Sequence, residues 1–418
     1  MTTMHGWRGE RFQLLKKNLL ELPNEGEYGY IIQCDISIPK SLHRAHSDFG
    51  FLCENKVPPL EGSKHSKLLI TLEDKKDYVI HFVALKQALQ HGLILQKIHR
   101  AIRFRQKAYL KPLIELSAQL RKEAKGNPFY QTATKLICNS VFGKFLESPL
   151  KRKIIKLVTK PEQLNKLVSR ANFKSTTSFA EDLVAVHMKK TKVNFNRPVI
   201  VGFSILELSK VHMYEFYQDV LLTQYSRENI SLIYMDTDSF VFYFETEDRY
   251  KDMLQNLHFY DTSNFQTDHP CFSSKNEKKT GTFKDETAGE PISHFISLKS
   301  KVYAYRLGEK QDLRVKGLQN CVARKTLNFD HFYKVLMDNI EIYRDTRRIQ
   351  SDKHTLYSFQ TRKKALCGFD DKRVVLKGNI KTLPYGHIDL LRKRGLEGED
   401  SGNEDESIAK YSRKNDSL

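Results

Sequence analysis

Two aspartates separated by one residue are the strongest candidates for chemistry. Asp236 and Asp238 lie in the run YMDTDS, residues 234–239, between the apolar segments 231–235 and 240–244. Side chains two apart at a strand end lean to the same side, and a carboxylate pair in apolar surroundings is costly unless cations neutralise it. The spacing predicts a site for two Mg²⁺ ions that align an attacking hydroxyl with a phosphate. The alternative is an ordinary polar turn, since Asp, Thr and Ser favour turns.

A second set of polar and aromatic side chains follows Pro128, where Asn127 and the proline predict the start of a helix. Lys135, Asn139 and Phe142 are spaced so that they share one helical face. A cation, an amide and a ring on one stripe can hold a triphosphate and stack beneath a base. The adjacent glycine, residue 143, would allow a base pair to approach closely. The alternative is an amphipathic helix with an incidental lysine.

Basic and aromatic residues also alternate between positions 299 and 305. In a single strand, one face would carry Lys299, Lys301, Tyr303 and Tyr305. The opposite face would carry Leu298, Val302 and Ala304. Such a strand suits a sheet that lays its outer side against a nucleic-acid duplex. An ordinary surface strand is the alternative.

The overall composition favours a polyanionic partner. Lys and Arg number 69 against 50 acidic residues, for a net charge of +19, and nucleic acid is the commonest partner of so basic a chain. Residues 97–111 hold six basic residues and no acid, with Phe104 and Tyr109 interleaved. This pattern fits either a surface that follows a nucleic-acid backbone or a solvated face. Arg121 and Lys125 could add phosphate contacts, although a solvated face is the favoured interpretation there.

The same composition indicates a compartment. The six cysteines are scattered without a CxxC pair, which argues for a reducing environment and against a zinc ribbon. No apolar run is as long as a membrane span, and residues 1–12 lack the apolar stretch of a signal peptide. We therefore expect an intracellular protein without a membrane partner, in the nucleus if the gene is eukaryotic.

Simple local signals predict the elements that must position these residues. The expected strands cover residues 29–33, 78–81 and 151–158. The expected helices end at Gly92, run from 111 to 125, begin at Asn127-Pro128, and begin at Ile205. A hairpin is expected around 236–238, while 147–200 is less regular and 246–282 forms a polar connection. The tail beyond Gly395 lacks apolar residues and is expected to be disordered.

Taken together, the motifs resemble the family-B DNA polymerases. YMDTDS resembles the YxDTDS signature, KLICNSVFGK at 135–144 resembles the KxxxNSxYG fingers motif, and their order is the same. Lys301-Val-Tyr303 is similar to the KxY primer-binding element. Segments 29–49 and 78–111 are similar to the protein-primed branch of viruses, linear plasmids and large DNA transposons. The resemblance extends over roughly residues 5–345.

This resemblance implies an α+β right-hand polymerase, with a palm of antiparallel sheet and helices, fingers helices and a thumb. The implied segments are a palm remnant with an insertion at 1–110, fingers at 111–146, a second insertion at 147–195, palm with catalytic hairpin at 196–316, thumb and C-terminal region at 317–395, and a disordered tail at 396–418. The family's N-terminal exonuclease is absent from this arrangement.

The resemblance also implies roles for individual residues. Asp236 and Asp238 would be the palm carboxylates that bind two Mg²⁺ ions, with Asp238 the more direct ligand. By the same resemblance, Lys135 and Arg121 would bind the nucleotide phosphates, and Asn139 and Phe142 would line the nascent base pair. Gly143 would allow the DNA to approach. Lys301 and Tyr303 would bind the primer strand. Phe142 stands where the family has Tyr, so the stacking ring is kept and its hydroxyl is lost.

A two-metal polymerase needs a third carboxylate, which the family supplies from a DxxSLYP element. Asp35-Ile-Ser-Ile-Pro39 has Ser and Pro at the wrong offsets and no Tyr. HGWRGERF at 5–12 resembles the residues that follow the element's Tyr, so we expect the missing Asp at or before Met1 and a chain truncated at its catalytic core. His43 and His46 lack a third ligand and are expected to be surface or core residues.

The sequence thus predicts a DNA-directed DNA polymerase that adds deoxynucleotides to a primer 3′-hydroxyl in DNA replication, with electrostatics and positioning supplying most of the catalysis. Its expected partners are a primed DNA template, dNTPs and a terminal priming protein. The alternative is a catalytically dead, nucleic-acid-binding remnant of a mobile element. Reverse transcription is less favoured, because that group carries adjacent carboxylates, YxDD, in place of DTD.

Overall fold

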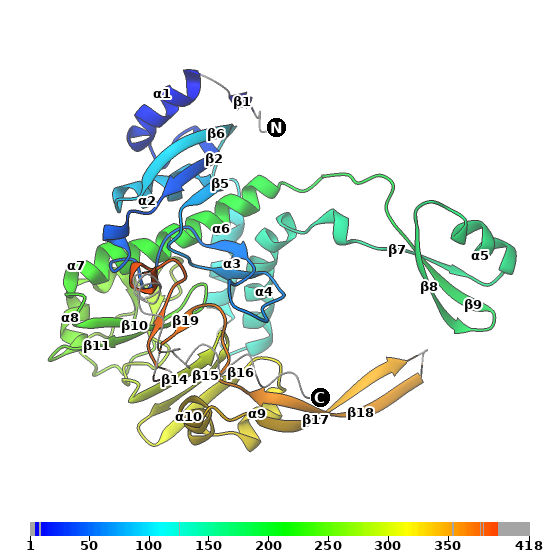
Figure 1. Ribbon diagram of the computed structural model, residues 1–418. Helices are drawn as coiled ribbons and strands as arrows, with labels where there is room; N and C mark the ends of the chain where they lie inside the picture. Colours follow the sequence, from blue (N-terminus) through cyan, green and yellow to red (C-terminus); the bar gives the residue numbers. More distant parts are fainter. Residues whose placement is uncertain are drawn as a thin grey trace, which may run out of the picture. The chain divides into compact units, whose positions relative to one another are not determined.

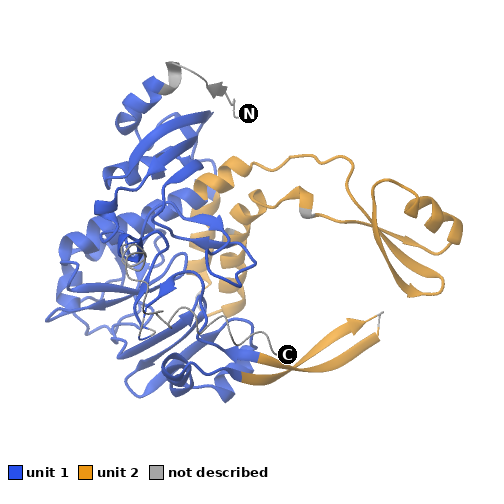
Figure 2. Cartoon of the chain, in the orientation of Figure 1, with its two compact units in different colours: residues 1–112, 206–342, 364–418 blue, residues 113–205, 343–363 orange. Residues whose placement is uncertain are grey.

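The computed structural model describes residues 5–7, 10–124, 126–352, 355–376, 378 and 380–391. The predicted disordered tail at 396–418 and Lys125 lie outside the described residues. The chain divides into two compact units (Figure 2). Unit 1 comprises Met1–Pro112, Leu206–Ile342 and Lys364–Leu418, and unit 2 comprises Leu113–Ile205 and Tyr343–Lys363.

Unit 1 opens with an antiparallel sheet of order β1-β6-β2-β5 (Figure 1). Its strands are β1 (His5–Trp7), β2 (Tyr28–Ser37), β5 (Lys75–His81) and β6 (Ile94–Arg105), accompanied by helices α1 (Glu10–Asn18) and α2 (Phe82–Gln90). The predicted strands at 29–33 and 78–81 are confirmed, each within a longer strand. Gly92 follows α2 with φ of 91°, as expected for a residue that ends a helix. Ile32 and Ile36 of the central strand are fully buried.

A long helical run forms the second layer of this core. It comprises α6 (Val199–Tyr214), the π-helical segment η4 (Glu215–Leu221) and α7 (Leu222–Gln224). The predicted helix is confirmed, but it begins at Val199 instead of Ile205. Its buried side chains are largely aromatic, and Phe216 stacks on Phe283 with ring centroids 3.9 Å apart. This aromatic layer lies beneath the predicted hairpin.

The hairpin itself is confirmed as β10 (Ile230–Met235) and β11 (Phe240–Phe244), paired antiparallel. Leu232 and Phe242 pack against the core, while Ile233 and Tyr243 are exposed. The apolar segments that flank the turn are therefore buried on one face alone. A two-stranded ribbon buries one face, and its alternate side chains point to solvent.

The segment 246–282 is more ordered than a polar connection, which corrects the sequence prediction. It contains α8 (Arg249–Gln255), a 3-10 turn at Leu257–Phe259 and β12 (Tyr260–Asp261), which pairs in parallel with β13 (Phe283–Lys284). The Asp248 side chain caps α8 by accepting hydrogen bonds from Tyr250 N–H at 2.9 Å and from Lys251 N–H at 3.1 Å. A few widely spaced buried residues, such as Met253 and Cys271, anchor it, and they are too sparse to give a periodic signal.

A three-stranded sheet with its own core follows. It consists of β14 (His294–Lys299), β15 (Val302–Leu307) and β16 (Lys310–Val315), packed with α9 (Asn320–Thr326) and α10 (Phe329–Asp338). The prediction of one strand over 299–305 is wrong. A turn at 300–301 separates β14 from β15, and Lys301 has φ of 63°. The predicted apolar positions Leu298, Val302 and Ala304 are nevertheless buried.

The C-terminal part of unit 1 packs on a loop near the start of the chain. Here lie the short pairs β3 (Glu54–Lys56) with β4 (Lys67–Leu69) and β19 (Val374–Val375) with β20 (Thr382–Leu383). Asp371 joins the two regions by accepting a hydrogen bond from Ser63 Oγ at 2.7 Å and pairing with Lys67. His43 and His46 are core residues, as one of the sequence alternatives predicted.

Unit 2 contains the two predicted helices and a small sheet. The helices are α3 (Lys111–Glu123) and α4 (Pro128–Phe145), and Asn127 caps α4 as predicted by accepting from Tyr130 N–H at 3.2 Å. The predicted strand at 151–158 is confirmed as β7 (Ile154–Val158), but the prediction that the rest of 147–200 is less regular is wrong. The segment also forms α5 (Pro161–Val168), β8 (Phe173–Ala180) and β9 (Leu183–Met188), in the sheet order β7-β9-β8. Most of the hairpin of β17 (Ile342–Asp352) and β18 (Thr355–Leu366) also belongs to unit 2.

Three further 3-10 turns lie at Leu19–Glu21, Lys40–Leu42 and Pro149–Lys151. The α+β class predicted from the sequence is confirmed, because helices and antiparallel sheets share the same cores. None of the described helices combines the length and the apolar character that crossing a bilayer requires.

Candidate active site

The turn between β10 and β11, in unit 1, holds the two predicted aspartates. Asp236 N–H donates to Ser239 O at 3.0 Å, and Ser239 N–H donates back to Asp236 O at 3.2 Å. Thr237 has φ of 57°, which is rare for a β-branched residue. Its hydroxyl donates to Asp236 Oδ1 at 3.2 Å. The backbone thus fixes a tight turn whose side chains remain accessible, with Asp238 exposed.

The two aspartates differ in what they contact. Asp236 forms an ion pair with Lys301, and the two side chains are 25% and 45% exposed. The hydrogen bond to Asp236 raises the pKa of Lys301, so the lysine stays charged. Among the described residues, none forms an ion pair with Asp238. One carboxylate therefore already carries a cation, and the other is free to take one.

Tyr234 joins this hairpin to the neighbouring sheet. Its hydroxyl accepts a hydrogen bond from Lys301 N–H at 2.9 Å. Its ring packs against Phe295 and Tyr303, with centroids 5.8 and 5.1 Å away. Burial is the main cause that raises the pKa of Tyr234, which keeps the hydroxyl neutral. The structure therefore brings Asp236, Lys301 and Tyr303 together. Sequence reasoning assigned no role to Tyr234, although it is the first residue of YMDTDS.

Aromatic side chains support the hairpin from below. Phe240, the first residue of β11, contacts Phe49 at 5.6 Å, Tyr217 at 6.2 Å and Phe216 at 6.4 Å between ring centroids. These rings belong to the large core of unit 1. Because interiors are closely packed, the position of the turn is set by this layer.

The second predicted set lies on α4 in unit 2. Lys135 and Asn139 are exposed and Phe142 is half-buried. Within the described part of the chain, neither polar side chain forms a hydrogen bond or ion pair. A Cβ placed on Gly143 would meet no atom within 4 Å, so this surface is open for close approach. Arg121, half-buried on α3, likewise has no ion-pair partner among the described residues. The structure therefore places the two predicted sets of site residues in different units.

The hairpin suits a hard divalent cation. Carboxylate oxygens are the ligands that Mg²⁺ prefers, and the Lys301 ammonium on Asp236 shows that this carboxylate accepts a cation in the fold. Two carboxylates fit the first part of the predicted metal site. Among the described residues, one cluster of three potential metal ligands is found, formed by Asp35, Asp77 and His99. None of these residues belongs to the hairpin.

The carboxylate of Asp35 already has hydrogen-bond and charged partners within the protein. Its carboxylate accepts a hydrogen bond from Asp77 N–H at 2.9 Å and contacts His99 Nε2 at 2.8 Å. The backbone donor is the largest cause that lowers the pKa of Asp35, followed by the hydrogen bond to His99. Lys76 lies 3.8 Å away and adds a positive charge. These contacts agree with the interpretation that Asp35 is not the third catalytic carboxylate.

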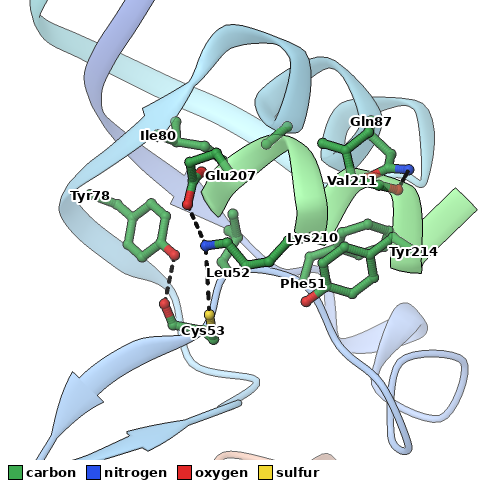
Figure 3. Close-up of a pocket in the computed structure, with 11 residues that line it drawn as sticks. Phe51, Leu52, Cys53, Tyr78, Ile80, Gln87, Glu207, Lys210, Val211 and Tyr214 are labelled. Atoms are coloured by element: carbon green, nitrogen blue, oxygen red, sulfur yellow. Dashed lines mark hydrogen bonds and ion pairs between the residues drawn. The ribbon is translucent and has the colours of Figure 1, made fainter. Parts of the chain in front are cut away.

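A cavity in unit 1 lies away from these groups and is too small for a nucleotide (Figure 3). Its volume is about 20 Å³, enough for about one water molecule, whereas ligand pockets usually exceed about 300 Å³. Tyr78 OH donates to Cys53 O at 2.6 Å, and Lys210 pairs with Glu207 beside it. We interpret the cavity as a packing defect where α6 meets β5.

Comparison with known proteins adds an independent line of evidence. Residues 31–223 match the family described as DNA polymerase type B, organellar and viral. The matched segment includes α4 and ends before the hairpin. No curated protein matches the sequence.

Among solved structures, the chain is similar to Phi29 DNA polymerase complexed with single-stranded DNA. The identity is 13% and the TM-score 0.44, over 81% of this chain and 50% of the other. The chain thus spans about half the length of that polymerase.

Proposed function

Because residues 31–223 match the family described as DNA polymerase type B, organellar and viral, we propose that the chain polymerises DNA on a template. It adds deoxynucleotides to a primer 3′-hydroxyl, as part of a protein-primed replicative enzyme. The observation that carries the proposal is the pair Asp236 and Asp238 at the tip of a hairpin, with Lys301 and Tyr303 beside it. These residues lie in the segments that resemble the family's YxDTDS and KxY motifs, and their contacts support the proposal.

In this proposal, Asp238 is the direct ligand of Mg²⁺ and Asp236 a less direct one. The bound ions supply charge stabilisation and activate the 3′-hydroxyl. Asp238 can do this because it is exposed and unpaired among the described residues. The tight turn keeps both carboxylates at a set spacing, which favours electrostatic preorganisation.

The incoming nucleotide would bind to the face of α4. Lys135 contacts its phosphates, with Arg121 as a further phosphate contact, because a charged donor to a phosphate forms a strong hydrogen bond. Asn139 and Phe142 line the nascent base pair, and Gly143 admits it. In this arrangement α3 and α4 act as fingers, and the hairpin and its aromatic core act as palm.

The primer strand would lie along β14 and β15, where Lys301 contacts a phosphate and Tyr303 packs beside the sugar. The expected partners are primed DNA, dNTPs and a terminal priming protein. A net charge of +19 supports the polyanionic part of this set. Binding to primed DNA should weaken steeply as salt rises, because phosphate contacts release counterions.

Primer extension tests the proposal. The purified chain should extend a labelled primer on a template with Mg²⁺ and dNTPs, and the double variant Asp236→Ala, Asp238→Ala should not. Asp268→Ala, which removes another exposed carboxylate of unit 1, is the matched control and should extend normally. If the unmutated chain binds primed DNA without extending it, the enzyme proposal fails and the chain is a nucleic-acid-binding remnant.

A further inference from the structure

We propose that Lys301 is a built-in counter-ion of Asp236 which a divalent metal ion displaces, and that Tyr234 holds the lysine in place for this exchange. This inference rests on the proposed function, because it concerns the same hairpin. It adds a role for Lys301 before DNA arrives, and a role for Tyr234, to which no function has been assigned above.

The backbone of Lys301 is held at both of its polar groups. Its N–H donates to Tyr234 OH at 2.9 Å, and its carbonyl accepts from Lys316 N–H at 2.9 Å. The residue has φ of 63°, a conformation that a non-glycine residue adopts only when its surroundings compensate. The turn is therefore fixed in a form that directs the Lys301 side chain toward Asp236.

The tyrosine that fixes this turn comes from the catalytic hairpin itself. Tyr234 is two residues before Asp236 on β10, so the acceptor for the Lys301 backbone and the partner of its ammonium belong to one strand end. The Tyr234 ring packs against Phe295 and Tyr303, which also stack on each other with ring centroids 5.6 Å apart. Lys301 is thus positioned against Asp236 by two contacts from the same segment, which a chance surface ion pair would lack.

Electrostatics make the pair exchangeable. Both side chains are partly exposed, and exposed ion pairs contribute little to stability. A divalent ion that binds Asp236 must replace this lysine or share the carboxylate with it, and the two cations repel each other. The flexible stem of lysine lets the ammonium swing away without moving the turn. Once displaced, the ammonium is free for a primer phosphate, so metal binding and primer binding become coupled through one side chain.

A purely structural role for Lys301 gives the opposite expectation. If the lysine only stabilised the turn, its removal would loosen the carboxylates and weaken metal binding. If it is a counter-ion, its removal leaves Asp236 unpaired and strengthens metal binding. Affinity for the metal alone, without DNA or nucleotide, therefore separates the two roles.

Mn²⁺ titration of the full chain, followed by the electron paramagnetic resonance signal of free Mn²⁺, provides the test. Lys301→Met should bind Mn²⁺ about five- to tenfold more tightly than the wild type, a typical size for coupling between two ligands of one site. Lys301→Gln should behave in the same way, so the result does not depend on one variant. Lys299→Met, which removes a charge from the neighbouring strand end, is the matched control and should change the affinity less than about twofold.

Tyr234→Phe should give an intermediate affinity, because the lysine keeps its charge but loses the hydrogen bond that positions its backbone. Adding Asp236→Asn to Lys301→Met should remove the gain, which shows that the gain acts through this carboxylate. Thermal unfolding of each variant confirms that the chain is folded.

Two results would overturn the inference, and they differ in meaning. Mn²⁺ affinity of Lys301→Met equal to or weaker than that of the wild type rejects the counter-ion role and leaves the polymerase proposal intact. If neither the wild type nor any variant shows Mn²⁺ binding that depends on Asp236, the proposed metal centre is rejected, and this inference with it.

Discussion

The two predicted sets of site residues, at the hairpin and on α4, differ in the polar contacts of their side chains. At the hairpin, Asp236 is paired with Lys301, and Tyr234 secures the lysine from the same strand. On α4, Lys135 and Asn139 are exposed and form no polar contact with described residues. Asp236 and Lys301 are thus held by contacts within unit 1. The polar side chains of α4, like the carboxylate of Asp238, remain open to a ligand.

The packing beneath the hairpin also differs from the packing of α4. The hairpin rests on Phe216, which is 5% exposed and stacks within the aromatic core. The helix α4 carries large exposed apolar residues, among them Phe129 at 74% and Leu136 at 68%. The position of the hairpin therefore depends on packing, whereas that of α4 depends on helix geometry and capping. Substitutions in the two places should have different consequences.

The largest effect is expected at the unpaired carboxylate. Asp238→Asn should lower the rate of primer extension by about 10³-fold or more, because a metal ion supplies several kcal/mol of transition-state stabilisation. The thermal midpoint should change little, since the side chain is exposed and unpaired among the described residues. Extension kinetics and a thermal melt on the same preparation check both parts. An active Asp238→Asn chain would remove the distinction drawn between the two aspartates.

The next effect is on stability. Phe216→Ala should lower the free energy of unfolding of unit 1 by about 3–5 kcal/mol, the usual cost of truncating a buried ring. Leu136→Ala on α4 is the matched truncation and should cost less than about 1 kcal/mol, because the side chain already contacts water. Denaturant unfolding measures both. Equal losses would show that α4 is as deeply packed as the hairpin support.

A smaller effect is expected for the residues of α4 that are proposed to bind the nucleotide. Lys135→Met should raise the KM for dNTPs by about 10- to 100-fold, the size of one hydrogen bond to a charged group. Stability should be unchanged, because the lysine has no partner to lose among the described residues. Lys122→Met, an exposed lysine on α3, serves as the control. A KM that stays at the wild-type value would separate α4 from nucleotide binding.

The smallest effect comes from histidines in the core of unit 1. Burial lowers the pKa of His46 and of His81 to about 4. In the unfolded chain these histidines have pKa values near 6.5. As pH falls from about 6.5 to 4, they therefore become protonated in the unfolded chain but stay neutral in the folded chain. Stability is fully present above about pH 6.5 and should fall by up to about 1.4 kcal/mol per pH unit for each histidine.

Unfolding measured across this pH range checks the slope. His46→Gln should make it shallower by the share of one proton, and His258→Gln at an exposed position is the matched control. A slope that His46→Gln leaves unchanged would mean that this ring is protonated in the folded chain.

Local signals explain why much of this was predictable. The YMDTDS hairpin is bounded by two apolar runs, and the start of α4 is marked by Asn127 and Pro128, so neighbouring residues alone determine both. The same holds for Gly92 after α2. The two aspartates and the predicted residues of α4 are therefore found on the elements that the sequence predicted.

Other features depend on distant residues or lack a periodic pattern. Strand β8 reads FKSTTSFA, whose polar run gives no apolar alternation, so the sequence predicted β7 without this partner strand of its sheet. The turn at Lys301 breaks an alternation that looked like one strand, and Tyr234 stabilises it from 67 residues away. The contact between Lys301 and Asp236 is likewise long-range, which no local spacing rule can reveal.

The central claim is that the hairpin carboxylates serve a template-directed nucleotide transfer. Single-nucleotide incorporation tests it most directly, on four primed templates that differ only in the templating base. With Mg²⁺, the chain should add the complementary nucleotide on each template, and Asp238→Asn should add none. Incorporation that ignores the templating base, or that persists in Asp238→Asn, would contradict the claim.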